Sequence, residues 1–141
     1  MPARSFRIGR SPTGLGLFAI RPIAKKDFIV TYSGKRIPTK DAQHLERYAS
    51  AKYMFEISRR WTVDGSSRRN LARYINHSCR PNAEAVLRKG KIAIVAIRGI
   101  APGEEIAYDY GKDYFALFIK PKGCRCAACA RKTSRRRGRA R

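Results

Sequence analysis

The residues best suited to chemistry in this chain of 141 residues lie at 76–82, where the sequence reads Asn-His-Ser-Cys-Arg-Pro-Asn. An amide, an imidazole, a hydroxyl and a thiol stand side by side, directly after the apolar pair Tyr74-Ile75. Polar groups that enter a fold behind an apolar segment must find hydrogen bonds there. A single histidine in such a place is most often structural. The segment therefore predicts either a binding site or a polar loop held by internal hydrogen bonds.

Three of the four cysteines crowd into the run Cys124-x-Cys126-x-x-Cys129 near the C-terminus. This spacing suits a metal ion better than a disulfide that spans the fold. Structural zinc takes four ligands in a tetrahedron, and the run supplies only three. Either the site is catalytic with an open position, or a distant ligand completes it, and Cys79 is the only other thiol. Reduced thiols without a metal and a local disulfide are the remaining alternatives.

Two further stretches could shape a narrow pocket. Gly14 and Gly16 lack a Cβ, which lets backbone groups approach a ligand closely, although, taken alone, they are more typical of a tight turn. Tyr108 and Tyr110 lie two residues apart, so on a strand they share a face with Asp109 opposite. Such tyrosines are usually core packing, but a phenol can also bind or accept a proton in a pocket.

The elements that must position these groups are mostly short strands. Runs of β-type residues bounded by turn signals predict strands at 28–32, 52–57, 61–63, 83–87, 91–97 and 105–110. A helix capped by Thr39 is expected over about 39–50, and residues 70–75 predict a short turn or helix. Because βαβ alternation is absent, the expected fold class is mainly β with short helices.

The chain is strongly basic. It carries 32 Lys and Arg against 10 Asp and Glu, a formal net charge of +22, and 43% hydrophobic residues, enough for the core of one domain. Residues 131–141 hold seven cations and no acid, which predicts a disordered Arg-rich tail, and residues 1–130 still carry +15. No apolar run approaches the ~18 residues of a membrane span. Composition alone predicts a soluble, intracellular protein that adheres to polyanions.

In their order and spacing these stretches resemble the SET domain of protein-lysine methyltransferases, over about residues 5–130. The motifs that carry the resemblance are Gly14-Leu-Gly16-Leu-Phe-Ala, Tyr32-Ser-Gly34, Asn70-Leu-Ala-Arg-Tyr-Ile-Asn-His-Ser-Cys-Arg-Pro-Asn82 and Gly103-Glu-Glu-Ile-Ala-Tyr-Asp-Tyr110. The cysteines are similar to the family's zinc-binding post-SET segment, although their last spacing is two residues where the family commonly has four. The cysteine-rich pre-SET segment of some members is absent.

The resemblance implies a SET-domain β-clip fold of small curved sheets with a knot-like C-terminal crossing. It divides the chain into a SET domain at 1–117, a post-SET zinc-binding segment at 118–130 and the tail at 131–141. In this family the cofactor S-adenosylmethionine and the substrate lysine enter the fold from opposite sides.

The resemblance also assigns site residues. Cofactor contacts are expected from Gly14, Gly16, Leu17, Phe18, Tyr53, Arg73, Asn76, His77 and Tyr110, and zinc ligation from Cys79, Cys124, Cys126 and Cys129. Tyr110, Tyr32 and Tyr108 match the catalytic and channel positions. A phenol at Tyr108, where the family has Phe or Tyr, favours mono- or dimethylation.

The implied function is S-adenosylmethionine-dependent protein-lysine N-methylation of a Lys-rich, DNA-associated protein such as a histone or nucleoid protein. We expect non-specific contact with nucleic acid through the basic surface and tail, and no membrane contact. The expected location is intracellular: the cytoplasm or nucleoid if the protein is bacterial, and the nucleus or chromatin if it is eukaryotic or delivered into a host. The alternatives are a basic nucleic-acid-binding module with a zinc knuckle, and a scaffold that binds the cofactor without turnover. Tyr32, Asn76, His77 and Tyr110, all present at matching positions, favour the enzyme.

Overall fold

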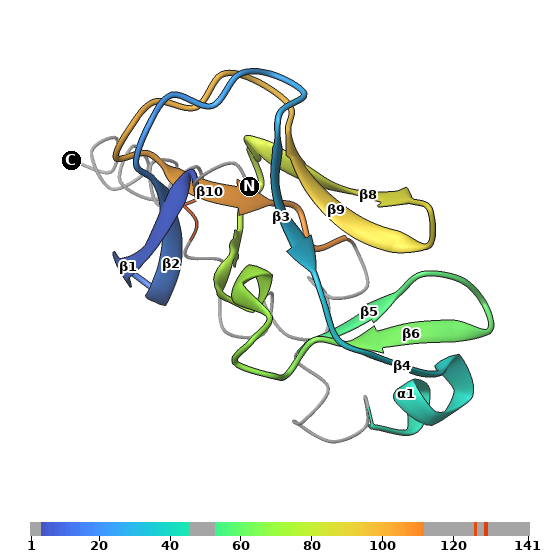
Figure 1. Ribbon diagram of the computed structural model, residues 1–141. Coiled ribbons are helices and arrows are strands. Elements are labelled where there is room, and N and C mark those ends of the chain that lie inside the picture. The colour runs from blue at the N-terminus through green and yellow to red at the C-terminus, as the bar shows by residue number, and fades with distance from the viewer. Residues whose placement is uncertain (1–3, 46–52, 112–125, 127–128, 130–141) are drawn as a thin grey trace.

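The computed structural model describes residues 4–45, 53–111, Cys126 and Cys129, which form small sheets and short helices around one core (Figure 1). The first sheet contains, in spatial order, β1 (Phe6–Ser11), β2 (Gly14–Ala19), β10 (Glu105–Tyr108) and β7 (Asn76–His77). The second contains β3 (Phe28–Tyr32), β9 (Lys91–Ala96) and β8 (Ala83–Arg88). The third contains β4 (Lys35–Pro38), β6 (Trp61–Asp64) and β5 (Met54–Glu56). The helices are α1 (Thr39–Leu45) and the 3-10 helix η2 (Leu71–Tyr74). No described helix is long and apolar enough to cross a membrane.

The strands predicted by local sequence patterns are present. β3 has the predicted bounds, and β8 and β9 form the predicted hairpin, whose turn places Lys89 and Gly90 at φ of 50° and 76°. Helix α1 begins at Thr39 as predicted, and its expected continuation at 46–50 lies outside the described residues. The Thr39 hydroxyl donates to the carbonyl of Ser58 at 3.1 Å and lies 3.1 Å from the Thr62 hydroxyl, so it ties α1 to β6.

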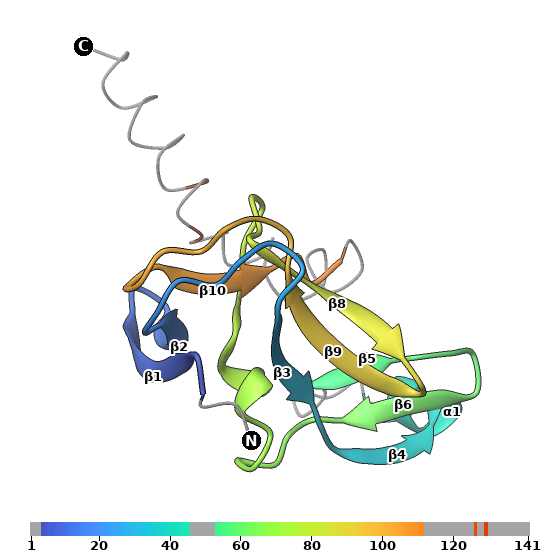
Figure 2. The ribbon, with the colours of Figure 1, turned by 45° about the horizontal axis from the view of Figure 1, so that its top comes forward.

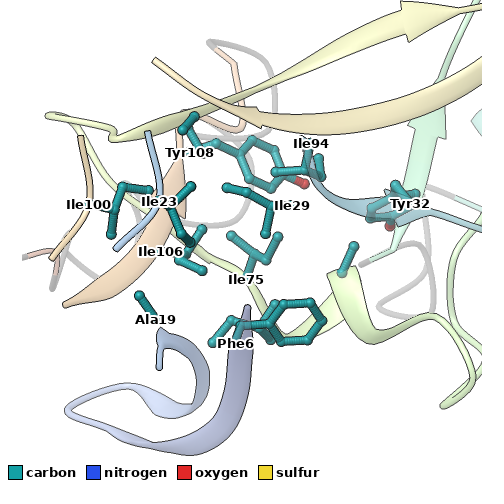
Figure 3. Close-up of a cluster of buried hydrophobic side chains, with 14 of the residues drawn as sticks. Phe6, Ala19, Ile23, Ile29, Tyr32, Ile75, Ile94, Ile100, Ile106 and Tyr108 are labelled. Atoms are coloured by element: carbon teal, nitrogen blue, oxygen red, sulfur yellow. The ribbon is translucent and has the colours of Figure 1, made fainter. Parts of the chain in front are cut away.

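The hydrophobic core lies where β2, β3, β9, β10 and η2 meet (Figure 3). Leu17, Ile94 and Ile106 are completely buried. Removing side chains of this size from water stabilises the fold by ~1.5–3 kcal/mol each. Tyr32 and Tyr108 also belong to the core, with 5% and 7% of their surface exposed, so two of the sequence-predicted channel residues are held by packing.

Strand β10 joins segments that are distant in the sequence. It pairs antiparallel with β2, with Ile106 opposite Leu17, and parallel with β7, with Tyr108 opposite His77. The side chain of Asn82 completes this crossing, because its Nδ2 donates to the Glu105 carbonyl at 2.8 Å and its Oδ1 accepts from the Ala107 N–H at 2.9 Å. The Asn-His segment and the tyrosine segment therefore meet at this crossing. The domain boundaries predicted at 117 and 130 lie outside the described residues.

Candidate functional site

Asn76 is the polar centre of the crossing. Its Nδ2 lies 2.7 Å from Oε2 of Glu105 and 3.0 Å from the Leu15 carbonyl, and it donates to the Ser11 hydroxyl at 3.1 Å. Carboxylate and carbonyl oxygens only accept hydrogen bonds, so the NH₂ end of the amide must face them. Oδ1 is then the end of Asn76 that is left to accept a hydrogen bond from a ligand. Sequence analysis missed Ser11 and Glu105 here, since nothing local links them to Asn76.

The two predicted glycines serve different purposes. A Cβ on Gly16 would lie 2.5 Å from Oε2 of Glu105 and 3.0 Å from Nδ2 of Asn76, so a side chain here would push the Glu105 carboxylate from its place beside the amide. Gly14 has φ of 120° with open space around its Cβ position, which is the requirement of a turn. The two residues that follow Gly16 differ in their burial. Leu17 is completely buried in the core, and Phe18 is half-buried with the Arg7 guanidinium 5.0 Å from its ring centre.

His77 connects the crossing to the cysteines. Its Nδ1 accepts the backbone N–H of Tyr110 at 3.1 Å, and its Nε2 lies 3.4 Å from Sγ of Cys79. Burial lowers the pKa of His77, and Asp109, 3.8 Å from Nδ1, opposes that shift. A ring nitrogen that accepts a hydrogen bond carries no proton, which agrees with a neutral imidazole protonated at Nε2.

Tyr108 and Tyr110 pack against each other, and a hydrogen bond to the backbone fixes the hydroxyl of Tyr110. Tyr110 donates its hydroxyl to the Ile75 carbonyl, and its ring lies 5.0 Å from that of Tyr108 and 5.4 Å from that of His77. The predicted strand ends at Tyr108, because Asp109 accepts the Gly111 N–H at 2.9 Å in a turn. Figure 3 shows Tyr108 among the core side chains near Ile94.

Tyr32 fits the core because Gly65 has no Cβ, and Gly34 likewise makes room for the backbone of Asp64. Its hydroxyl donates to the Tyr53 carbonyl at 2.5 Å, and a Cβ on Gly65 would lie within 2.4 to 2.5 Å of its ring and hydroxyl. A Cβ on Gly34 would lie 1.9 Å from the carbonyl oxygen of Asp64. Sequence analysis missed Gly65, whose only local signal is its position just after a strand.

Arg73 and Tyr53, two predicted cofactor residues, gather beside Tyr32. The Arg73 guanidinium lies 4.2 Å from the Tyr53 ring centre, and its Nη1 donates to the Ser66 carbonyl at 2.5 Å. Hydrogen bonding to Tyr53 raises the pKa of Arg73, so this position carries a permanent cation. Both residues therefore lie on the Tyr32 side of the core, whereas the Asn76 amide is held by Ser11, Leu15 and Glu105.

Three of the four predicted metal ligands come together. The Sγ atoms of Cys79, Cys126 and Cys129 all lie within 4.8 Å of one another, and those of Cys79 and Cys129 are 3.7 Å apart. A tetrahedron with Zn–S bonds of ~2.3 Å separates its sulfurs by about 3.8 Å, so this donor set fits zinc. Cys124 lies outside the described residues.

Comparison with known sequences identifies one family. The profile of the SET domain matches residues 14–111. The H3 lysine-4 specific histone-lysine N-methyltransferase of Debaryomyces hansenii is 38% identical over 104 residues, covering 67% of this chain and 10% of that protein. The protein of the same description from Schizosaccharomyces pombe is 41% identical over 105 residues, covering 68% of this chain and 11% of that protein. The histone-lysine N-methyltransferase trr of Drosophila melanogaster is 41% identical over 108 residues, covering 71% and 4%. The chain therefore spans roughly a tenth or less of these relatives.

Comparison with solved structures agrees. A structure of ctPRC2 in complex with H3K27me3 and H3K27M is 28% identical, with a TM-score of 0.70, over 79% of this chain and 15% of that one. A humanized mutant of the Chaetomium thermophilum Polycomb Repressive Complex 2 bound to the inhibitor GSK126 is also 28% identical, with a TM-score of 0.67. This match covers 78% of this chain and 15% of that one. These similarities confirm the mainly β fold of small curved sheets that the sequence predicted.

Proposed function

This chain belongs to the SET-domain family, and we propose that it is an S-adenosylmethionine-dependent protein-lysine N-methyltransferase. The observation that carries the proposal is the assembly of Gly16, Asn76 and Tyr110 around strand β10 from three segments distant in the sequence. The similarity to histone-lysine methyltransferases supports it. A core that served only to bind nucleic acid would have no need of this assembly.

The chemistry of the donor set fits the amino-acid part of S-adenosylmethionine. An ammonium group needs acceptors, and the Oδ1 of Asn76 and the remaining lone pairs of the Glu105 carboxylate supply them beside the strand at Gly16. His77 would contribute a neutral ring, with only 6% of its side chain exposed, on the same strand, β7, as Asn76. Bound there, the cofactor supplies a methyl group on a sulfonium sulfur.

The tyrosines suit the other reactant. Free lysine has a pKa of ~10.4 and must lose its proton before it can act as a nucleophile. Burial among Tyr32, Tyr108 and Tyr110 would lower that pKa by desolvation, and the fixed cation of Arg73 beside Tyr32 acts in the same direction. The Tyr110 hydroxyl and the Ile75 carbonyl would orient the amine. Alignment of two reactants can be worth ~7–11 kcal/mol of the barrier.

Replacing Gly16 by alanine tests the cofactor pocket. We expect cofactor affinity to fall by at least about tenfold, because the new Cβ must displace Glu105 or Asn76, 2.5 Å and 3.0 Å away. Isothermal titration with S-adenosylmethionine measures the effect. Gly99→Ala is the matched control, because the nearest atom to its Cβ, the carbonyl of Ile23, lies at 4.0 Å. Equal affinities in the two variants would place the cofactor elsewhere.

We further propose mono- or dimethylation as the main outcome. Tyr108 is buried, with its ring 5.0 Å from that of Tyr110, so its hydroxyl occupies space in the core beside the proposed catalytic tyrosine. A phenol there fills volume and holds water near the amine, which disfavours further methylation.

Replacing Tyr108 by phenylalanine should therefore raise the product state toward trimethyl-lysine. The change removes one oxygen from a packed site and leaves the ring contacts intact, so we expect little loss of stability. Mass spectrometry of a methylated peptide over a time course reads the product. Mainly trimethyl-lysine from the unaltered protein would refute the preference.

We propose zinc as the metal at Cys79, Cys126 and Cys129, with Cys124 as the fourth ligand. The spacing of the described sulfurs supports this choice. The ion would tie the C-terminal cysteines to the segment that carries Asn76 and His77. Its role would be structural, since four thiolates leave no open position.

The proposed substrates are histones or histone-like nucleoid proteins, met on DNA. The relatives named as histone methyltransferases support histones, and the net charge of +22 supports contact with nucleic acid at chromatin or a nucleoid. The direct test offers labelled S-adenosylmethionine with purified histones and nucleoid proteins, each with and without DNA. Labelled methyl-lysine supports the enzyme. Cofactor binding without any transfer would favour a scaffold, and DNA binding alone would favour a nucleic-acid-binding module.

A further inference from the structure

Two β-turns form one end of the molecule, away from the crossing. The turn of the β5–β6 hairpin, residues 57–60, and that of the β8–β9 hairpin, residues 88–91, lie close together and point the same way in both ribbon views, while β1 and β2 lie at the other end (Figures 1 and 2). A hydrogen bond supports this arrangement, because Nη2 of Arg36 on β4 donates to the Gly90 carbonyl at 2.5 Å.

The surface of these turns is basic. Six exposed cations define what we call the turn surface: Arg36, Arg59, Arg60, Arg88, Lys89 and Lys91. Among the described residues the ion pairs are Arg98 with Glu104 and His77 with Asp109, so no described acid neutralises any of the six. The nearest described acids along the chain are Asp41, Glu56, Asp64 and Glu84, and none of them forms an ion pair with another described residue.

Two apolar side chains are exposed beside these cations. Trp61 begins β6, directly after Arg60, with 41% of its surface exposed, and Leu87 precedes Arg88 with 57% exposed. Register places Trp61 opposite Pro38, two residues along β4 from Arg36, which is about 7 Å on a strand. Trp61 therefore lies among the cations of the turn surface.

We infer that the turn surface binds the phosphate backbone of double-stranded DNA without reading its sequence. Duplex DNA carries one charge per ~1.7 Å of axis, so cations spread over two turns and one strand all meet phosphates on it. Positioning contacts of this kind go to phosphates from Arg and Lys. The turns lie at the Arg88 end of β8, whereas the crossing lies at its other end, next to Asn82, so DNA on the turn surface can leave the crossing uncovered. The inference does not depend on methyl transfer.

Salt dependence of DNA binding by the full chain tests this inference. Each phosphate contact contributes about −0.9 to the slope of log K against log salt, so removing two contacts should flatten the slope by about 1.8. We expect this in Arg59→Gln/Arg60→Gln and again in Arg88→Gln/Lys89→Asn, where asparagine suits the φ of 50° at residue 89. Anisotropy of a labelled 25-bp duplex from about 50 to 200 mM salt measures the slope.

Lys25→Gln/Lys26→Asn is the matched control. It removes the same charge outside the turn surface, just before β3, at residues whose φ of 75° at Lys26 also accepts asparagine. We expect the control to keep the slope of the unaltered protein. Turn variants with an unaltered slope would overturn the inference and leave the tail as the DNA contact. A control that flattens the slope as much as the turn variants do would overturn it in favour of contacts spread over the whole basic surface.

Trp61 gives a second readout that locates the contact. It is the only tryptophan of the chain, so its emission reports on this surface alone. Duplex DNA should change the tryptophan emission of the unaltered protein, and added salt should reverse that change. In Arg59→Gln/Arg60→Gln, duplex DNA should change the emission only slightly. DNA binding with constant emission would contradict the inference, as would tighter binding of poly-glutamate than of duplex at equal charge. Methyl transfer to a short neutral peptide should be the same in the turn variants, which separates this test from that of the proposed activity.

Discussion

Replacing Tyr110 by phenylalanine should lower kcat for methyl transfer by about 100- to 1000-fold, the usual effect of removing one aimed polar group from an active site. The Tyr110 hydroxyl donates to the Ile75 carbonyl beside Asn76. Its ring packs 5.0 Å from that of Tyr108 and 5.4 Å from that of His77. Phenylalanine keeps these ring contacts and removes only the oxygen, so the loss in stability should be near 1 kcal/mol.

Single-turnover transfer of labelled methyl groups measures this effect, and a thermal melt confirms the fold. Tyr74→Phe is a matched control, because it removes a phenolic oxygen from η2, where Tyr74 packs half-buried against the core. A Tyr110→Phe enzyme that turns over as fast as the control would show that Tyr110 is not catalytic. Cofactor affinity should be nearly unchanged, so the loss appears in kcat rather than in binding.

Loss of zinc should abolish methyl transfer while leaving the β core folded. Structural zinc contributes on the order of 10 kcal/mol of ordering in small motifs. Its removal would release Cys79, whose Sγ lies 3.4 Å from Nε2 of His77, and would loosen the segment that holds Asn76. The core of Leu17, Ile94 and Ile106 contains no cysteine, so far-UV circular dichroism should change little.

Cys126→Ser tests this without a chelator, and Ala128→Ser is the neighbouring control that spares every cysteine. Metal analysis should find about one zinc per chain in the unaltered protein and in the control, and much less in Cys126→Ser. Adding zinc back after chelation should restore turnover of the unaltered protein. Full activity in protein with verified zinc loss would refute the structural role.

Local patterns were enough to predict most of the strands. Alternation and turn residues act within a few positions, so the β8–β9 hairpin and β3 follow from their own sequences. β10 is shorter than predicted because the turn at Asp109 and Gly111 ends it, and a local pattern does not show which of two tyrosines leaves the ladder. Residue types alone did not decide whether the segment at 76–82 is a binding site or a structural loop. The order of the motifs along the chain favoured the binding site.

The sequence by itself determined the kinds of groups in the site, their order and the family. Only the tertiary structure decided which of these residues contact one another. Asn76 meets Ser11, Leu15 and Glu105, between 29 and 65 residues away, because β10 lies between β2 and β7. Gly16 is required by those same neighbours, a reason that no local pattern contains. Contacts of this kind depend on strand order and register, which the whole core sets through burial, whereas a motif records only separations along the chain.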